Sequence, residues 1–305
     1  MQKVVVICGP TASGKTALSI ELAKRINGEI VSADSMQIYD EMNIGTAKPD
    51  QEEMQGIKHY LIGNIKPTNR YSVSEFKKNA ISAIKEIISK EKMPIVVGGT
   101  GLYVNSLVYG IDYPEIQTNL EYRKELEKIV EEKGLQYLFE KAIEIDKEAM
   151  KNISPNDKKR ILRVLEIYKE TGKTKTELER ESRKNGIPYD YKIFAINMPR
   201  EILYDRINRR VDIMIEKGLI DEVSSLYEKY GESLLTSMQA IGYKEVVEFL
   251  KGNCTKEEMI EKIKMETRRY AKRQLTWFRK IENIQWLDGL NDIQNNVNII
   301  LEGLQ

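Results

Sequence analysis

Gly9-Pro10-Thr11-Ala12-Ser13-Gly14-Lys15-Thr16 is the stretch that decides the fold of this chain. It follows a β-branched apolar run at residues 4–8 and precedes helical apolar spacing through Leu18, Leu22 and Ile26. The stretch matches the Gly-x-x-x-x-Gly-Lys-Thr pattern of a phosphate-binding P-loop, which requires a buried strand before it and a helix after it. Because both neighbours are in place, the sequence predicts a P-loop rather than a chance glycine turn.

Each residue type in this loop suits contact with a phosphate. Glycines let backbone N–H groups wrap an anion, and the N-terminus of the following helix adds a favourable dipole. Lys15 supplies a positive charge, and the Thr16 hydroxyl is placed to bind Mg²⁺, the one cofactor we expect. The loop residues that we expect to bind a di- or triphosphate are Gly9, Pro10, Thr11, Ala12, Ser13, Gly14, Lys15 and Thr16.

Strands and helices alternate after the loop. Residues 29–33 and 94–97 have the pattern of buried strands, and residues 71–90 between them have a helical pattern with one apolar face. This alternation predicts an α/β fold with a P-loop NTPase-like parallel sheet that is covered by helices on both faces.

The character of the sequence changes after Tyr113-Pro114. From about residue 120 to residue 181 the chain is charged, helical and free of strand patterns, and a strand pattern returns at residues 192–197. We therefore expect the first part of the α/β core at 1–113, an inserted helical domain at 114–189, and a mainly helical return to the core at 190–305.

Composition excludes several classes of protein. The 48 Lys and Arg residues nearly balance the 47 Asp and Glu residues, so a nucleic acid must be bound by a local basic patch. Two cysteines and one histidine are too few for a disulfide framework or a metal centre with nitrogen and sulfur ligands. The apolar run at residues 4–8 is too short to span a membrane or to form a signal peptide. We expect a cytoplasmic monomer with no membrane association and no obligate protein partner.

Asp34 is the carboxylate closest in sequence to the loop at the end of a predicted strand, where parallel sheets bind ligands. A nucleoside triphosphate hydrolase usually has an Asp at the end of a later apolar strand. Here the later strand is followed by Gly98-Gly99-Thr100 instead, which favours group transfer with diphosphate as the leaving group. An Asp at a strand end can also simply cap the next turn, and the residues alone leave both roles open.

Beyond the P-loop, an ordered set of motifs resembles the tRNA dimethylallyltransferases. The motifs lie at residues 9–16, 34–39, 44–49, 97–103, 156–160, 241–245 and 272–279. The resemblance extends from residue 4 to about residue 287. Two departures weaken any catalytic role for histidine: Lys58 precedes a single His59 where the family often has Pro-His-His, and Ser154-Pro155 replaces His-Pro.

The resemblance implies transfer of a dimethylallyl group from dimethylallyl diphosphate to N6 of the adenosine on the 3′ side of the anticodon in tRNA. The P-loop then holds the donor's diphosphate, and no ATP is consumed. We expect Asp34, Lys15, Thr16 and Thr100 to form the catalytic group, with Asp34 as the base that removes the N6 proton.

The acceptor adenine must leave its stack to reach a buried carboxylate. Ser35, Met36 and Gln37 follow Asp34 and are expected to line the base pocket, although Met36 could be ordinary core packing. Thr100 and Arg123 are candidates for holding the opened RNA.

Residues 262–280 carry eight basic residues and one acidic residue, interleaved with aromatic residues. This composition suits RNA phosphate contact and aromatic packing, although a solvated helix face would look the same without the family motif. The family motifs imply further tRNA contacts, including a second basic cluster through which the inserted helical domain is expected to contact tRNA. The residues expected to make these contacts are Lys159, Arg160, Ile161, Leu162, Arg163, Gln239, Gly242, Tyr243, Lys244, Lys272, Arg273, Gln274, Trp277 and Arg279.

Arg206 and Arg210 are spaced by four residues on a predicted helix, so both could reach the diphosphate from one face. They could equally be solvated charges that pair with Asp205 or Asp212. Two rival functions also remain open. A P-loop nucleoside or small-molecule kinase predicts turnover of ATP, and a P-loop RNA-binding module predicts nucleotide-dependent RNA affinity without a covalent product.

Overall fold

The computed structural model describes residues 1–113, 119–184, 186–234 and 237–305, and the chain divides into two compact units. Unit 1 contains Met1–Asn105 and Pro188–Gln305, and unit 2 contains Ser106–Ile187. The divisions at 105/106 and 187/188 precede the boundaries expected from sequence, 113/114 and 189/190, and residue 114 lies outside the described residues.

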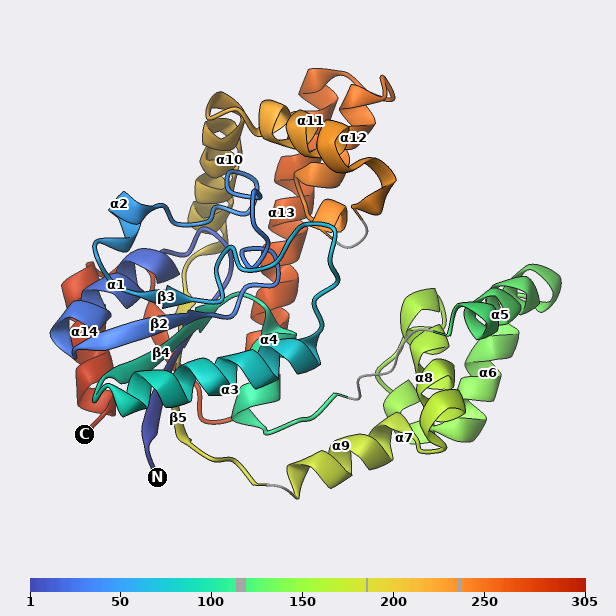
Figure 1. The fold of residues 1–305 in the computed structure, drawn as a ribbon, viewed down its shortest axis with the longest axis horizontal. Helices are drawn as coiled ribbons and strands as arrows, with labels where there is room; N and C mark the ends of the chain where they lie inside the picture. Colours follow the sequence, from blue (N-terminus) through green and yellow to red (C-terminus); the bar gives the residue numbers. More distant parts are fainter. Residues whose placement is uncertain (114–118, 185, 235–236) are drawn as a thin grey trace. The chain divides into compact units, whose positions relative to one another are not determined.

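A parallel sheet forms the centre of unit 1 (Figure 1). Its strands are β1 (Lys3–Cys8), β2 (Gly28–Ser32), β3 (His59–Tyr60), β4 (Met93–Gly98), β5 (Asp190–Asn197) and β6 (Gln285–Asp288). Their order in the sheet is β3-β2-β4-β1-β5-β6, and every neighbouring pair is parallel. The expected α/β fold is therefore confirmed.

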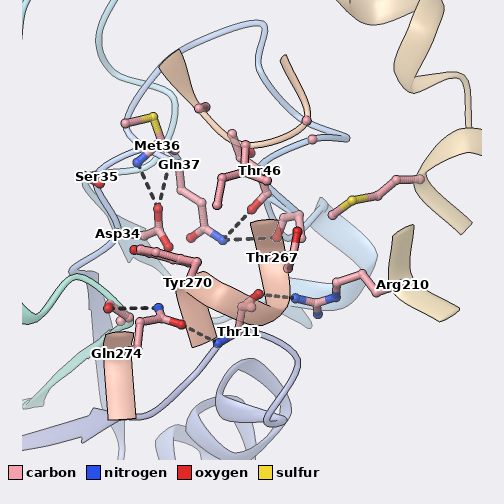
Figure 2. Close-up of a pocket in the computed structure, with 18 of the residues that line it drawn as sticks. Thr11, Asp34, Ser35, Met36, Gln37, Thr46, Arg210, Thr267, Tyr270 and Gln274 are labelled. Atoms are coloured by element: carbon pink, nitrogen blue, oxygen red, sulfur yellow. Dashed lines mark hydrogen bonds between the residues drawn. The ribbon is translucent and has the colours of Figure 1, made fainter. Parts of the chain in front are cut away.

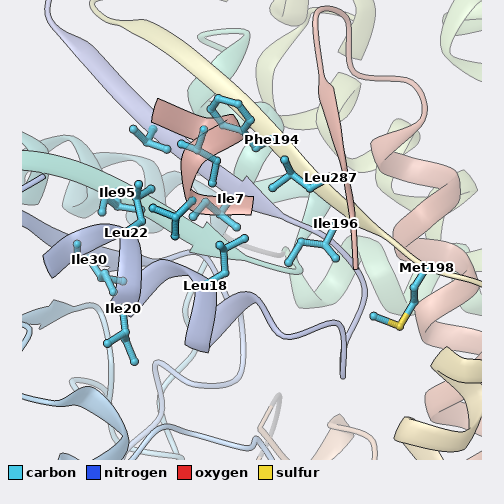
Figure 3. Packing of buried hydrophobic residues seen from close by; sticks show 14 of the residues in the cluster. Ile7, Leu18, Ile20, Leu22, Ile30, Ile95, Phe194, Ile196, Met198 and Leu287 are labelled. Atoms are coloured by element: carbon cyan, nitrogen blue, oxygen red, sulfur yellow. The ribbon is translucent and has the colours of Figure 1, made fainter. Parts of the chain in front are cut away.

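The central strand β1 is buried on both faces, since its residues from Val4 to Cys8 are at most 1% exposed. Val5 and Ile7 pack in one cluster with Leu18 and Leu22 of α1 (Lys15–Arg25) and with residues of α14 (Ile293–Gly303) (Figure 3). Because side chains alternate along a strand, Val4 and Val6 face the opposite side. There α3 (Val73–Ser89) lies against β2 and β4.

The boundaries of α3 follow from its own residues. Ser72 caps the helix by accepting a hydrogen bond from the Glu75 backbone, and the Glu75 side chain accepts one in return from the Ser72 backbone. Phe76, Ala80 and Ile84 follow at helical spacing and are all buried against the sheet.

A second hydrophobic cluster joins the segment after β2 to the C-terminal helices. Ile38, Tyr39 and Met42 pack with residues of α10 (Arg200–Glu216), α11 (Leu219–Tyr230), α12 (Tyr243–Leu250) and α13 (Lys256–Phe278). The remaining short elements of unit 1 are α2 (Gln51–Met54) and the 3₁₀ turns η1 (Gly231–Ser233) and η2 (Ser237–Gln239). Helix α4 (Gly101–Val108) begins in unit 1 and ends in unit 2.

The regular elements in the described residues of unit 2 are all helices. It contains α5 (Leu120–Lys133), α6 (Leu135–Ile145), α7 (Lys147–Met150), α8 (Lys158–Thr171) and α9 (Lys175–Arg183). Leu126, Leu138, Ala142, Ile161 and Leu165 form the centre of its own hydrophobic core. Across both units, none of the described helices has the length and apolar character needed to cross a membrane.

Candidate active site

A cavity of about 360 Å³ opens at the carboxyl ends of β1, β2 and β4, which is where open parallel sheets bind ligands. Its walls come from the phosphate loop, residues 34–37, residues 45–47, the turn after β4, and helices α10 and α13. Figure 2 shows the polar side chains around it.

The phosphate loop leaves the start of α1 open to an anion. Gly14 occupies the N-cap position with a left-handed φ of 91°, and no side chain caps the first amide groups of the helix. A residue with a Cβ would be strained at this φ. The free amides and the helix dipole together make this end of α1 a place for negative charge.

Lys15 lies within this loop, where its Nζ donates to the Pro10 carbonyl at 2.7 Å. Burial, and after it the positive charge of Arg210, lower its pKa from the ordinary 10.5 to about 8. The negative charge of Asp34 opposes these two effects and raises the pKa. A buried cation beside a second cation is an arrangement that an anionic ligand would stabilise.

The structure separates the two arginines that the sequence placed together. Arg210 lines the cavity, and its Nη1 donates to the Thr11 hydroxyl at 3.4 Å. Arg206 is exposed and lines neither this cavity nor the second one described below. Among the described residues neither arginine pairs with Asp205 or Asp212: those carboxylates pair with Arg209 and Lys264 instead.

Asp34 combines the two roles that the sequence left open. Its Oδ1 accepts hydrogen bonds from the Met36 backbone at 2.9 Å and from the Gln37 backbone at 3.3 Å, so one oxygen caps the turn. The carboxylate also lines the cavity, and within the described residues no hydrogen bond reaches Oδ2. One oxygen fixes the side chain and the other faces the cavity (Figure 2).

Ser35, Met36 and Gln37 all line the cavity next to Asp34. Met36 also packs against the second hydrophobic cluster, so it serves both as core and as cavity wall. The Gln37 amide donates to the Thr46 and Ala47 carbonyls at 3.3 and 3.1 Å, which holds residues 45–47 in the wall.

Thr100 connects the turn after β4 to the turn that contains Asp34. Its hydroxyl accepts from the Ser35 backbone at 3.0 Å and lies 3.3 Å from the Ser35 hydroxyl. Tyr270 of α13 lies beside Asp34 in Figure 2. Burial and the nearby Asp34 carboxylate raise the pKa of Tyr270 to about 12, so its hydroxyl stays protonated at neutral pH.

Gln274 ties helix α13 to two loops at once. Its Oε1 accepts from the Thr11 backbone at 2.9 Å, and its Nε2 donates to the Gly99 carbonyl at 2.9 Å. The side chain is only 4% exposed. Gln274 was expected to contact tRNA, but both ends of its amide are used to join α13 to the phosphate loop and to the turn after β4.

The side chains of the other residues expected to contact tRNA divide by exposure into an exposed or partly exposed group, the half-buried Trp277, and a fully buried group. Exposed or partly exposed side chains are those of Arg123, Lys159, Arg160, Arg163, Gln239, Lys244, Lys272, Arg273 and Arg279. Of these, Gln239, Lys244 and Arg273 also line the cavity, together with Gly242. Trp277 is half-buried against Gly101, and its indole N–H has no partner within the described residues.

The fully buried group corrects the expectations from sequence. Ile161 and Leu162 pack in the core of unit 2, and Tyr243 packs in the second cluster of unit 1. Each is at most 1% exposed, so direct RNA contact by these three side chains is wrong for this structure. The same motifs contain exposed or partly exposed residues that can contact RNA, such as Lys159 and Lys244, and buried residues that pack the helices.

Sequence reasoning missed part of the cavity wall. Tyr270 was noticed only as an aromatic residue in a basic helix, and Thr267 was not noticed at all. Residues 45–47 lay in a motif with no assigned role. The available signal was spacing, because Ile263, Thr267, Tyr270 and Gln274 recur every three or four residues along one face of α13.

A second cavity of about 520 Å³ lies on the other side of the phosphate loop. Lys15, Thr16 and Arg210 line both cavities, so an anion on the loop can be reached from two directions. His59 lines neither cavity, and its Nδ1 is 2.8 Å from the Ile57 carbonyl.

The metal-binding capacity of the site is limited. No group of three or more His, Cys, Asp or Glu side chains in the described ranges is placed to hold a metal ion. Mg²⁺ needs few protein ligands when a diphosphate and water supply the rest. The partly exposed Thr16 and the Asp34 carboxylate offer oxygen atoms along the cavity, so the residues fit a metal carried mainly by its phosphate ligand.

Comparisons with known proteins give matches that cover most of this chain. The family model described as IPP transferase matches residues 37–281. A tRNA dimethylallyltransferase of Acetivibrio thermocellus is 52% identical over 94% of this chain and 92% of that protein. One from Caldanaerobacter subterraneus is 50% identical over 93% of this chain and 91% of that protein.

Solved structures give the same result. The full-length tRNA isopentenylpyrophosphate transferase of Bacillus halodurans has a TM-score of 0.74 at 45% identity, over all of this chain and 97% of that one. A eukaryotic dimethylallyltransferase acting on tRNA has a TM-score of 0.82 at 32% identity, over all of this chain and 80% of that one.

Proposed function

This chain belongs to the IPP transferase family, and from that premise we propose how its cavity carries out dimethylallyl transfer to tRNA. The donor is dimethylallyl diphosphate, and the acceptor is N6 of the adenosine on the 3′ side of the anticodon. The observation that carries the proposal is that one cavity has a phosphate loop on one wall and the Asp34 carboxylate on another. The kinase alternative is not favoured by the relatives.

The donor's diphosphate binds at the phosphate loop. The uncapped amides at the start of α1, the Lys15 ammonium and the Arg210 guanidinium supply positive potential there. Stabilising the leaving diphosphate lowers the barrier to breaking the bond between C1 of the allyl group and its oxygen. Lys15 and Arg210 are therefore most effective as that bond breaks and negative charge grows on the diphosphate.

The acceptor adenine enters beside Asp34, after leaving its stack in the anticodon loop. Asp34 Oδ2 accepts the proton of the exocyclic amine while N6 forms a bond to C1 and the bond from C1 to the diphosphate oxygen breaks. The products are the N6-dimethylallyl adenosine, diphosphate and a protonated Asp34. Capping of the 34–37 turn by Oδ1 supports this role, because it fixes the carboxylate before substrate arrives.

Thr100 and Tyr270 support the same carboxylate from the other side. The Thr100 hydroxyl is held by the Ser35 backbone, and Tyr270 lines the cavity beside Asp34. Both are neutral hydrogen-bonding groups, and they can orient the adenine without competing for its proton.

Mg²⁺ bound to the diphosphate would neutralise charge on the leaving group. The Thr16 hydroxyl would be its protein ligand, as the location of this side chain along both cavities supports. Removal of Mg²⁺ with a chelator should raise the KM for the donor.

Contact with the rest of the tRNA falls to basic side chains in both units. Lys272 and Arg279 are exposed on α13, and Lys159, Arg160 and Arg163 lie on α8. Their charges suit phosphates, whose contribution to affinity decreases with salt. We further propose that the protein acts as a monomer in the cytoplasm.

Incubation with unmodified tRNA, Mg²⁺ and labelled dimethylallyl diphosphate tests the function. We expect label on one adenosine beside the anticodon without ATP. If no tRNA is labelled while ATP phosphorylates a small acceptor in a parallel reaction, the chain is a kinase. Nucleotide-dependent tRNA binding without a covalent product would instead indicate an RNA-binding module.

A further inference from the structure

Three consecutive backbone amides, which end at Gly45 in the cavity wall, converge on one distant side chain. The Asn43 and Ile44 amides donate to Glu222 Oε2 at 2.9 and 2.8 Å, and the Gly45 amide donates to Glu222 Oε1 at 3.2 Å. Glu222 belongs to α11, about 180 residues later in the chain. A carboxylate that accepts several backbone amides is a strong anchor, because each bond is charge-assisted.

A fourth donor fixes the carboxylate itself. The Tyr243 hydroxyl donates to Glu222 Oε1 at 2.6 Å, and Tyr243 is fully buried. Its ring lies against Gly45 so closely that a Cβ at position 45 would overlap ring atoms. The glycine is therefore required by this close approach, and the ring and the carboxylate hold the segment 43–45 together.

The anchored segment leads directly to the acceptor side of the cavity. Gly45, Thr46 and Ala47 line the cavity, and the Thr46 and Ala47 carbonyls accept from the Gln37 side chain. The Gln37 backbone in turn donates to Asp34 Oδ1. Hydrogen bonds, the backbone from Gly45 to Ala47 and the residue Gln37 thus form a continuous path from Glu222 to Asp34. No part of this path passes through the phosphate loop.

We propose that Glu222 is a positioning residue for the adenine that accepts the dimethylallyl group. It fixes residues 45–47, which form the wall against which that adenine is placed. It contacts neither substrate and takes no proton. The inference rests on the proposed function and adds a residue through which α11 controls the acceptor end of the cavity alone.

The segment after β2 offers a matched control that pairs with the same helix, α11. Glu41 accepts from Lys229 Nζ and from the Tyr230 hydroxyl, each at 2.6 Å, and so also joins the segment after β2 to α11. Unlike Glu222, it accepts no hydrogen bond from the Gly45 amide in the cavity wall, and neither of the two carboxylates lines the cavity. Glu41→Gln therefore removes a comparable link between the same two parts of the protein without releasing residues 43–45.

The test compares Glu222→Gln with Glu41→Gln for transfer kinetics, inorganic diphosphate binding and thermal unfolding. Gln places an N–H₂ group against amide donors, so we expect kcat/KM for tRNA to fall about tenfold or more in Glu222→Gln. Diphosphate affinity should stay within about twofold of the wild type, since the loop is not on the path. Glu41→Gln should leave both kinetic measurements unchanged, whatever its effect on thermal unfolding.

Two more variants guard against misfolding. Tyr243→Phe keeps the ring and all three amide bonds, and should retain most of the tRNA kcat/KM. Glu222→Asp keeps the charge on a shorter side chain, and should give a folded protein with an intermediate loss. The inference is overturned if Glu222→Gln and Glu222→Asp match Glu41→Gln in tRNA kinetics, or if diphosphate binding falls together with tRNA kinetics. If the wild type itself transfers nothing to tRNA, the proposed function fails instead.

Discussion

The two ends of the cavity are built in different ways. The phosphate end is built mainly from one continuous stretch, residues 9–16, with Arg210 of α10 beside it, and its backbone amides provide much of the anion site. The acceptor end is assembled from segments far apart in the chain and depends on side chains such as Gln37, Glu222 and Gln274. A contiguous backbone site can be recognised from a short motif, whereas an assembled wall depends on which side chains meet after folding.

This difference makes the two ends separable by mutation. Changes at the phosphate end should act on the donor, and changes at the acceptor end should act on tRNA or on the chemical step. Gln274 is the exception, because it bonds to both the phosphate loop and the turn after β4.

The largest effect is expected at Asp34. Asp34→Asn keeps an oxygen that can accept the Met36 and Gln37 amides, so the turn should persist. It removes the base, and kcat should fall about 10²–10⁴-fold while donor affinity stays unchanged. Single-turnover transfer and diphosphate binding measure the two quantities. Full activity in Asp34→Asn would show that Asp34 only caps the turn.

The next largest effect separates the two arginines. Arg210→Ala should raise the donor KM about 10–100-fold, the loss expected for one charge-assisted hydrogen bond to a phosphate. Arg206→Ala should leave it unchanged, because Arg206 is exposed and outside both cavities. Equal effects of the two substitutions on donor KM would contradict the placement of the diphosphate at the phosphate loop.

Gln274→Ala should affect both ends of the cavity and the stability of the fold. It leaves the Thr11 amide and the Gly99 carbonyl without their side-chain partner, which should lower the free energy of unfolding by about 1–3 kcal/mol. Lys272→Ala on the same helix is exposed and should change it by less than about 0.5 kcal/mol. Urea unfolding of the two variants is the measurement, and equal losses would mean that the Gln274 bridge contributes little.

The smallest effect is a pH dependence of donor binding. Lys15 has a pKa of about 8 in the free protein, so it carries its charge below that pH and loses it above. Diphosphate affinity should therefore fall above pH 8, by at most about tenfold per pH unit. Arg210→Ala removes a neighbouring positive charge and should move the inflection to higher pH. An affinity that does not change between about pH 7 and pH 9.5 would contradict this role of Lys15.

Much of the fold could be predicted because its central strands are continuous apolar runs. The expected strands at 29–33 and 94–97 correspond to β2 and β4, and the helix at 71–90 corresponds to α3. The sequence did not reveal β3 and β6, which lie at the two edges of the sheet. β3 has two residues, and in β6 only Leu287 is buried, so neither carries an apolar pattern.

The site was predicted where backbone chemistry determines it and only partly elsewhere. The phosphate loop and Asp34 were found because their residue types and neighbours specify them. The motif on α8 did not distinguish exposed Lys159 and Arg160 from buried Ile161 and Leu162, although helical periodicity does so. Glu222 could not be found from sequence, because its role depends on amides about 180 residues away.

A crystal structure of the protein with an anticodon stem-loop and a non-transferable analogue of dimethylallyl diphosphate tests the central claim most directly. We predict the diphosphate on the phosphate loop at the uncapped amides that begin α1, and the extruded adenine with N6 within about 3.2 Å of Asp34 Oδ2. The account would be contradicted if the diphosphate lay away from the phosphate loop, or if N6 lay against another wall of the cavity with Asp34 still bonded only to its own turn.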